Sequence, residues 1–226
     1  MCGRFTLRSS VKEIAEALES TSVKIKEEKA RYNIAPTQDI IAAREEGENR
    51  ELVMLHWGLV PSWAKDPAVG ARMINARSET VTEKPSFREA FQRRRCLIPS
   101  SGFYEWKREG TRKQPFYFQM RDEQLFAFAG LWERWEGEGS EAIESRTILT
   151  TVANEVLAPV HDRMPVIVAP EDYELWLDQK MTKGDQLTPL LRPYSLEMMT
   201  SHPVSLSVNN PRYDGEDLLA PLINSQ

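Results

Sequence analysis

The sequence contains few of the residues that hold disulfide-rich or metal-binding domains together. Its 226 residues include only two cysteines and three histidines. Cys2 and Cys96 cannot build a disulfide framework, so we expect a reducing compartment, the cytoplasm. The histidines, at positions 56, 161 and 202, show no paired ligand spacing with the cysteines. We therefore expect no structural zinc site and no other metal or cofactor.

Long apolar runs are absent as well. No stretch approaches the ~20 apolar residues that span a membrane, so we expect no membrane partner. Arg4 and Arg8 interrupt the apolar residues near the start, and no signal-peptide core follows them. A chain of this length suits one domain, and we predict a single domain over residues 1–226.

The chain also lacks the net positive charge that a general nucleic-acid coat requires. Its formal net charge is −5, but residues 1–120 carry 21 basic against 16 acidic residues, whereas residues 121–226 carry 8 against 18. Residues 72–113 alone hold 11 basic and 5 acidic residues. A basic sector on an acidic protein favours a localised anionic ligand. The alternative is that the three arginines at 93–95 form a solvated helix end.

Short apolar runs predict an α+β fold. Ser10 and Glu13 form a capping box that opens a helix to about Glu19, and further helices are expected over 86–94 and 170–178. Residues 20–30 are expected to form a loop, and residues 31–37 to be irregular because of Pro36. Strands are predicted at 38–43, 51–57, 95–98, 103–107, 115–121, 125–131, 146–152, 166–168 and 204–208. Because no regular βαβ alternation occurs, we predict a mainly antiparallel, barrel-like sheet with a few peripheral helices.

Cys2 directly follows the initiator methionine. If Met1 is removed, Cys2 presents an α-amine and a thiol on adjacent carbons. An amine with a pKa of about 7.7–8.0 is partly neutral at pH 7 and can attack an aldehyde to form an imine. The sulfur can then close a five-membered thiazolidine ring, an intramolecular step that gains from high effective molarity. A small second residue also occurs by chance, so its position alone is only a hypothesis of function.

Three further residues could orient a substrate or transfer protons. Asn75 could hydrogen-bond a substrate hydroxyl or hold the N-terminal amine. Glu105, if it shares a strand face with Phe103, lies in apolar surroundings that raise a carboxyl pKa and suit a general acid. Otherwise it is an outward-facing residue paired with Lys107. His161 could move protons near neutral pH, or it could be a satisfied structural histidine.

Several residues could bind a polyanion with exposed bases. Arg4, Arg77 and Arg163 could each hold phosphate. Trp63, on a loop rich in proline and glycine, could stack on an unpaired base. The alternative for Trp63 is that it caps the loop.

These stretches occur in a fixed order along the chain. They are Met1-Cys2-Gly3-Arg4-Phe5, Arg31-Tyr32-Asn33-Ile34-Ala35-Pro36, Trp57-Gly58-Leu59-Val60-Pro61-Ser62-Trp63, Asn75-Ala76-Arg77-Ser78-Glu79, Gly102-Phe103-Tyr104-Glu105-Trp106 and His161-Asp162-Arg163-Met164-Pro165. Together they resemble the SRAP (SOS-response-associated peptidase) family of abasic-site-processing proteins. The resemblance covers most of the chain, up to Ser201-His202-Pro203-Val204, with no departure at a position that the family uses chemically.

The resemblance implies the SRAP fold and a role in the DNA damage response. Family members bind single-stranded DNA with an abasic site and form a thiazolidine crosslink between the N-terminal cysteine and the C1′ aldehyde. Cys2, Asn75, Glu105 and His161 match the catalytic residues; Arg4, Asn33, Trp63, Arg77 and Arg163 are the expected DNA-binding residues. Strand cleavage by a lyase side reaction is a natural competitor of ring closure. The peptidase activity in the family name is best interpreted as removal of Met1 to free Cys2, and the residues leave open whether that removal is autocatalytic.

Three rival functions remain open at this point. An N-terminal-nucleophile amidohydrolase would use the Cys2 amine as a base for its thiol. A non-catalytic single-strand-binding module would need the arginines and Trp63 but not Cys2, and a Cys-His-Glu protease is the third. For the preferred function we expect a monomer in the cytoplasm that associates with the nucleoid on damaged DNA.

Overall fold

The computed structural model describes residues 2–137, 139, 141–182 and 184–222. The strands are β1 (Arg4–Leu7), β2 (Ser22–Val23), β3 (Arg31–Ile34), β4 (Asp39–Glu46), β5 (Asn49–Trp57), β6 (Asn75–Arg77), β7 (Arg95–Ser100), β8 (Gly102–Glu109), β9 (Arg112–Met120), β10 (Phe126–Trp135), β11 (Ile143–Val152), β12 (Arg163–Pro165), β13 (Ile167–Val168) and β14 (Met199–Pro203). The α-helices are α1 (Val11–Ala17), α2 (Arg88–Arg93), α3 (Tyr173–Leu177) and α4 (Gly184–Leu187). Short 3-10 helices are η1 (Pro67–Arg72), η2 (Pro170–Asp172), η3 (Thr188–Leu190), η4 (Leu196–Met198), η5 (Leu206–Asn209) and η6 (Glu216–Leu219).

The larger sheet closes on itself. Its strands β11, β10, β7, β4 and β5 follow one another through antiparallel pairings. β5 then pairs back with β11 in parallel, with Arg146 opposite Trp57. This ring confirms the predicted mainly antiparallel, barrel-like sheet.

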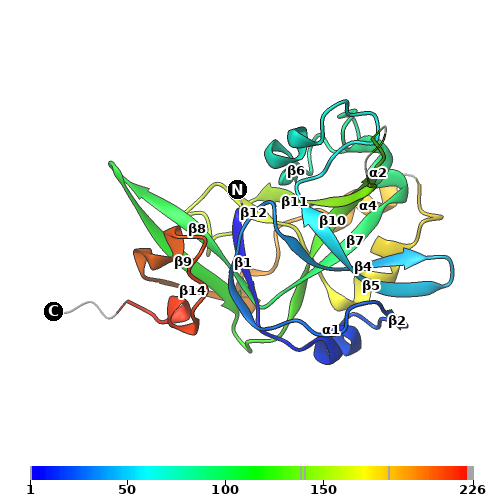
Figure 1. The fold of residues 1–226 in the computed structure, drawn as a ribbon. Coiled ribbons are helices and arrows are strands. Elements are labelled where there is room, and N and C mark those ends of the chain that lie inside the picture. The colour runs from blue at the N-terminus through cyan, green and yellow to red at the C-terminus, as the bar shows by residue number, and fades with distance from the viewer. Residues whose placement is uncertain (1, 138, 140, 183, 223–226) are drawn as a thin grey trace.

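The smaller sheet has the strand order β14-β9-β8-β1-β3. Its β8–β9 hairpin projects away from the rest of the molecule, as the green strands in Figure 1 show. β1 joins this sheet to the barrel because the Phe5 ring packs edge-on against Trp57 at 5.3 Å and against Phe128 at 5.8 Å between centroids. The two sheets therefore share one apolar core.

The α-helices lie at the edges of the sheets (Figure 1). The predicted capping box is present at α1, where the Ser10 side chain accepts from the Glu13 backbone N–H and the Glu13 carboxylate accepts from the Ser10 N–H. α2 and α3 fall within the predicted spans 86–94 and 170–178. Within the described residues, no helix has the length and apolarity needed to cross a bilayer.

Three predictions of local structure differ from the structure. Residues 31–34 form the strand β3, paired with β1, because Pro36 lies beyond the strand end and leaves the ladder intact. Residues 204–208 do not form a strand: β14 ends at Pro203, and the Ser205 hydroxyl caps the 3-10 helix η5 by accepting from the Ser207 N–H. A two-residue strand, β2, also lies within the segment expected to be a loop.

Candidate active site

Cys2 lies just before β1, at the junction of the two sheets. The antiparallel register that sets Arg4 opposite Tyr104 carries the chain before Arg4 towards Glu105 on β8. The Cys2 side chain is fully buried, and burial, followed by the charge of Glu105, raises the pKa of its thiol to about 12. Arg146 acts in the opposite direction and lowers that pKa.

Asn75 fixes the backbone of Cys2. It opens β6, which pairs in parallel with β11 so that Asn75 lies opposite Ile148. Its side-chain amide donates to the Cys2 carbonyl oxygen at 2.8 Å. The Asn75 Oδ1 atom is buried and has no hydrogen-bond partner among the described residues. Asn75 therefore holds Cys2 through its carbonyl and keeps a free acceptor beside the cysteine.

Glu105 points into the protein from β8. It shares its strand face with the buried Phe103 and is only 2 % exposed, so it is not an outward-facing partner of Lys107. Burial raises the pKa of the Glu105 carboxyl, and the neighbouring His161 is among the groups that act to lower it. A raised pKa favours the protonated carboxyl, which is the form that a general acid needs.

His161 immediately precedes the short strand β12, two residues from Arg163. The Arg163 backbone N–H donates to His161 Nδ1 at 3.0 Å, and Asp162 Oδ1 also lies 3.0 Å from Nδ1. These contacts demand different protonation of Nδ1. The backbone donor is fixed whereas Asp162 is largely exposed, so we take Nδ1 as the acceptor of the Arg163 N–H.

The predicted catalytic residues thus come from both sheets. The smaller sheet supplies Cys2 and Glu105, and the larger sheet supplies Asn75 and His161. Cys2 is linked to Asn75 by a hydrogen bond and to Glu105 by electrostatic interaction, and Glu105 in turn to His161. This arrangement combines a buried thiol and a buried raised-pKa acid with a half-buried amide and a half-buried imidazole.

Arg4 and Asn33 form hydrogen bonds with the backbone of the C-terminal segment. Arg4 donates to Asn33 Oδ1 and to the Val208 carbonyl, each at 2.7 Å. The Asn33 amide group, which is 2 % exposed, donates to the carbonyls of Val208, Asn210 and Tyr213. No local sequence pattern indicates these long-range contacts, and a DNA-binding role for the two residues stays a prediction.

The remaining predicted DNA-binding residues differ in availability. Trp63 is 62 % exposed, whereas Trp57 is buried and its indole N–H donates to the Ile74 carbonyl. Arg77 is exposed on β6. Arg163 already forms a two-point ion pair with Glu79, at 2.5 and 2.9 Å, and this bonding lowers the Glu79 pKa. A phosphate at Arg163 would compete with Glu79.

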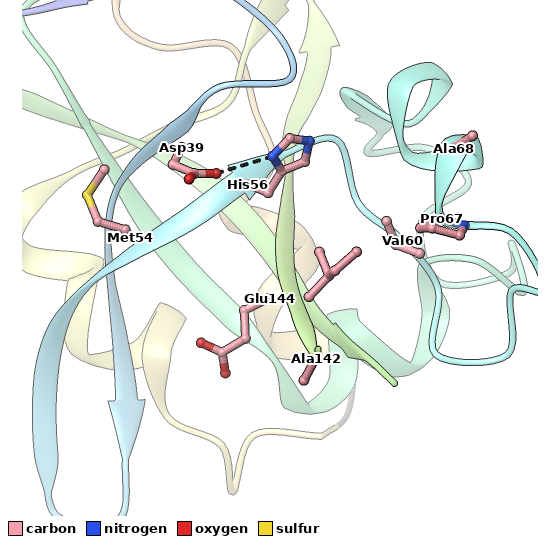
Figure 2. A pocket seen from close by; sticks show the side chains of 9 residues that line it. Asp39, Met54, His56, Val60, Pro67, Ala68, Ala142 and Glu144 are labelled. Atoms are coloured by element: carbon pink, nitrogen blue, oxygen red, sulfur yellow. Dashed lines mark hydrogen bonds and ion pairs between the residues drawn. The ribbon is translucent and has the colours of Figure 1, made fainter. Parts of the chain in front are cut away.

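A large pocket lies elsewhere on the barrel. It encloses about 580 Å³ and is lined by Asp39, Met54, His56, Val60, Pro67, Ala68, Ala142, Ile143 and Glu144. Figure 2 shows the His56 ring facing the Asp39 carboxylate, with 3.2 Å between Nδ1 and Oδ1. None of the predicted site residues lines this pocket. Among the described residues, no cluster of His, Cys, Asp and Glu could hold a metal ion.

The fold and the site define a mixed α+β protein with a thiol-centred site between two sheets. The profile of the SOS response associated peptidase (SRAP) family matches residues 1–211. The chain belongs to this family.

Relatives of similar length support this assignment. The chain is 44% identical over 221 residues to the abasic site processing protein YoaM of Bacillus subtilis (strain 168), covering 97% of both chains. It is 31% identical over 229 residues to the abasic site processing protein YedK of Escherichia coli (strain K12), covering 98% of this chain and 100% of that one. A crystal structure of a Bacteroides thetaiotaomicron protein superposes with a TM-score of 0.88 at 27% identity, covering 98% and 100% of the two chains.

Proposed function

We propose that this protein senses abasic sites in single-stranded DNA and shields them by forming a covalent crosslink through Cys2. The observation that carries the proposal is the buried contact set of Cys2, whose carbonyl is held by Asn75 and whose thiol lies in the field of Glu105. The names of the relatives above agree with this substrate.

The chemistry begins once Met1, which lies outside the described residues, has been removed. The Cys2 amine attacks the C1′ aldehyde of the open deoxyribose, and loss of water gives an imine. The Cys2 sulfur then bonds to C1′ while its proton passes to the imine nitrogen, which closes the thiazolidine ring. Glu105 exchanges a proton with the sugar ring oxygen to open the hemiacetal, and His161 relays protons during imine formation.

The DNA strand passes over the exposed residues around the site. Trp63 stacks on a flanking base, and Arg77 binds a flanking phosphate. Arg163 binds a second phosphate by exchanging its Glu79 partner. Arg4 and Asn33 contribute by holding the C-terminal segment beside the DNA strand, and Arg4 also adds positive charge.

Several finer properties belong to the same proposal. The imine acidifies the C2′ protons, so strand cleavage by β-elimination competes with ring closure as a lyase side reaction. Removal of Met1, by the protein itself or by an aminopeptidase, exposes the Cys2 amine. The protein acts as a monomer in the cytoplasm, associated with the nucleoid at damaged DNA, and residues 1–226 form one SRAP domain.

Intact-protein mass spectrometry tests the proposal. Wild type, Cys2→Ala and Cys96→Ala are mixed with a single-stranded oligonucleotide that carries one abasic site. Cys96 is the matched control because it is the other buried thiol. We expect a heat-resistant adduct, on a chain lacking Met1, for wild type and Cys96→Ala but not for Cys2→Ala.

The opposite result has a clear meaning. Intact DNA without adduct, on protein verified to start at Cys2, would refute the proposal. Labelling of Cys2 by a glutamine analogue under the same conditions would then favour the amidohydrolase. Equal DNA retention by wild type and Cys2→Ala, without any adduct, would favour the non-catalytic binding module.

A further inference from the structure

Arg146 is a buried cation inside the barrel. It lies on β11 at the closure point of the barrel, opposite Trp57 on β5 and Trp132 on β10. Its side chain is fully buried, and none of its three guanidinium nitrogens has a hydrogen-bond partner among the described residues. Although burial lowers the pKa of Arg146 to about 9, the side chain remains protonated at pH 7.

The surroundings of Arg146 are aromatic rings and thiols. Its Cζ atom lies 4.5 Å from the Trp57 ring centroid and 5.6 Å from that of Phe5, three residues after Cys2. The groups whose charge acts on Arg146 are the thiols of Cys96 and Cys2. Arg146 therefore lies over rings that attract a cation but cannot neutralise it, and its charge acts on both buried thiols.

Arg44 is a second buried arginine of the same barrel and serves as a comparison. Arg44 stacks on Trp132 at 4.2 Å, as Arg146 stacks on Trp57, but it is also ion-paired with Glu144 at 2.9 Å. An unpaired buried charge is costly, and apolar side chains of similar volume often replace buried charges without loss of stability. A role in stability therefore does not account for Arg146.

We propose that Arg146 is a positioning residue for the proposed reaction: its buried, unpaired guanidinium stabilises negative charge on the Cys2 sulfur when the thiazolidine ring closes. This inference rests on the proposed function for its substrate, but its electrostatic part concerns Cys2 alone.

The step that Arg146 assists is the second one. The imine carbon is electrophilic, and the sulfur bonds to it as the thiol proton moves to the imine nitrogen. Charge develops on sulfur in a region where Glu105 on β8 opposes it and Arg146 on β11 favours it. His161 acts on Glu105, and Cys96 on β7 shares the field of Arg146. Arg146 is thus a cationic side chain that acts against both burial and Glu105 at the nucleophile.

The test measures the rate of alkylation of Cys2 by iodoacetamide at several pH values near neutrality, read from the mass of the N-terminal peptide, on protein verified to start at Cys2. No DNA is needed. Because the thiol pKa lies far above this range, the rate follows the small thiolate fraction. We expect Arg146→Met to lower the rate about tenfold or more at each pH, because an opposite charge at close range shifts a pKa by about 1–3. Arg146→Lys should keep a rate near that of wild type. Arg44→Met, the matched control, should leave the rate unchanged.

Two further readouts separate this role from a structural one. The melting temperature should not fall in Arg146→Met. It should fall in Arg44→Met, because that substitution leaves the Glu144 carboxylate without its ion-pair partner. Adduct formation with abasic DNA at pH 7 should slow by about the same factor as alkylation. An unchanged alkylation rate in Arg146→Met would overturn the inference, as would a melting temperature lower than that of Arg44→Met.

The two proposals can fail separately. A lowered alkylation rate in Arg146→Met without any DNA adduct in wild type would refute the proposed function and leave the electrostatic role of Arg146 standing. Normal adduct formation with an unchanged alkylation rate would do the reverse. If Arg146→Met does not unfold cooperatively, Arg146→Gln, which is also uncharged, decides the alkylation test in the same way.

Discussion

Replacing Glu105 by glutamine should change how the stability of the protein depends on pH. Burial raises the pKa of the Glu105 carboxyl in the folded chain, whereas a glutamate in the unfolded chain has a pKa of about 4.3. Below about pH 4 the carboxyl is protonated in both states. As the pH rises from there through the folded-state pKa, the unfolded state is favoured because it loses its proton more easily.

The magnitude follows from linkage. Each whole pH unit between the two pKa values corresponds to about 1.4 kcal/mol of stability lost by wild type. For a chain of this length that is equivalent to about 3–6 °C in Tm. The glutamine side chain has nearly the same shape as that of Glu105 and no proton to lose, so the variant escapes this loss.

Thermal melts in steps of half a pH unit from pH 4 to pH 9 measure the effect. We expect the Tm of Glu105→Gln minus that of wild type to increase with pH and then level off. Glu109→Gln is the matched control, because Glu109 lies on the same strand and face but is exposed. A difference that stays flat with pH, or one that Glu109→Gln reproduces, would refute the assignment of Glu105 as a buried raised-pKa acid.

Two other substitutions probe the loop between β5 and β6. Trp63→Ala should leave Tm within about 2 °C of wild type, since the side chain is exposed, but weaken binding of single-stranded DNA by about 1–3 kcal/mol in a fluorescence anisotropy titration; unchanged affinity would remove Trp63 from the DNA path. Gly58→Ala should lower stability by about 2–4 kcal/mol in urea unfolding, because Gly58 has φ 139° and the new Cβ would lie 2.6 Å from the Gly70 carbonyl oxygen. Loss of less than about 1 kcal/mol would show that the loop can relax.

Much of the fold was predictable because its signals are local. Alternating apolar residues located most strands, and the capping box at Ser10 located α1 within two residues of its end. The parallel pairing of β5 with β11, which closes the barrel, was not predictable in register. Its partners, Trp57 and Arg146, lie far apart in the sequence, and no local pattern records which distant strands meet.

The candidate catalytic residues could be proposed from the chemistry of their side chains, but their environment could not be predicted. Cys2 and Glu105 are reactive side chains that lie in recognisable motifs, whereas Arg146 resembles an ordinary polar residue within a strand. Both faces of β11 are buried around Arg146. The alternation of apolar and polar residues that distinguishes the buried face from the exposed face in other strands is therefore missing there. The same limit applies to Arg163, because its ion pair with Glu79 joins residues 84 positions apart.

The burial of Cys2 also discriminates between the candidate chemistries. An amidohydrolase or a cysteine protease begins with attack by a thiolate, which a Cys2 pKa raised by burial to about 12 makes scarce at pH 7. Thiazolidine formation begins with a neutral amine and needs the sulfur only after an imine has formed. Protonation of that imine brings a positive charge beside the sulfur, and Arg146 supplies a second one. A buried thiol next to a buried cation is therefore poorly suited to a first attack and well suited to ring closure.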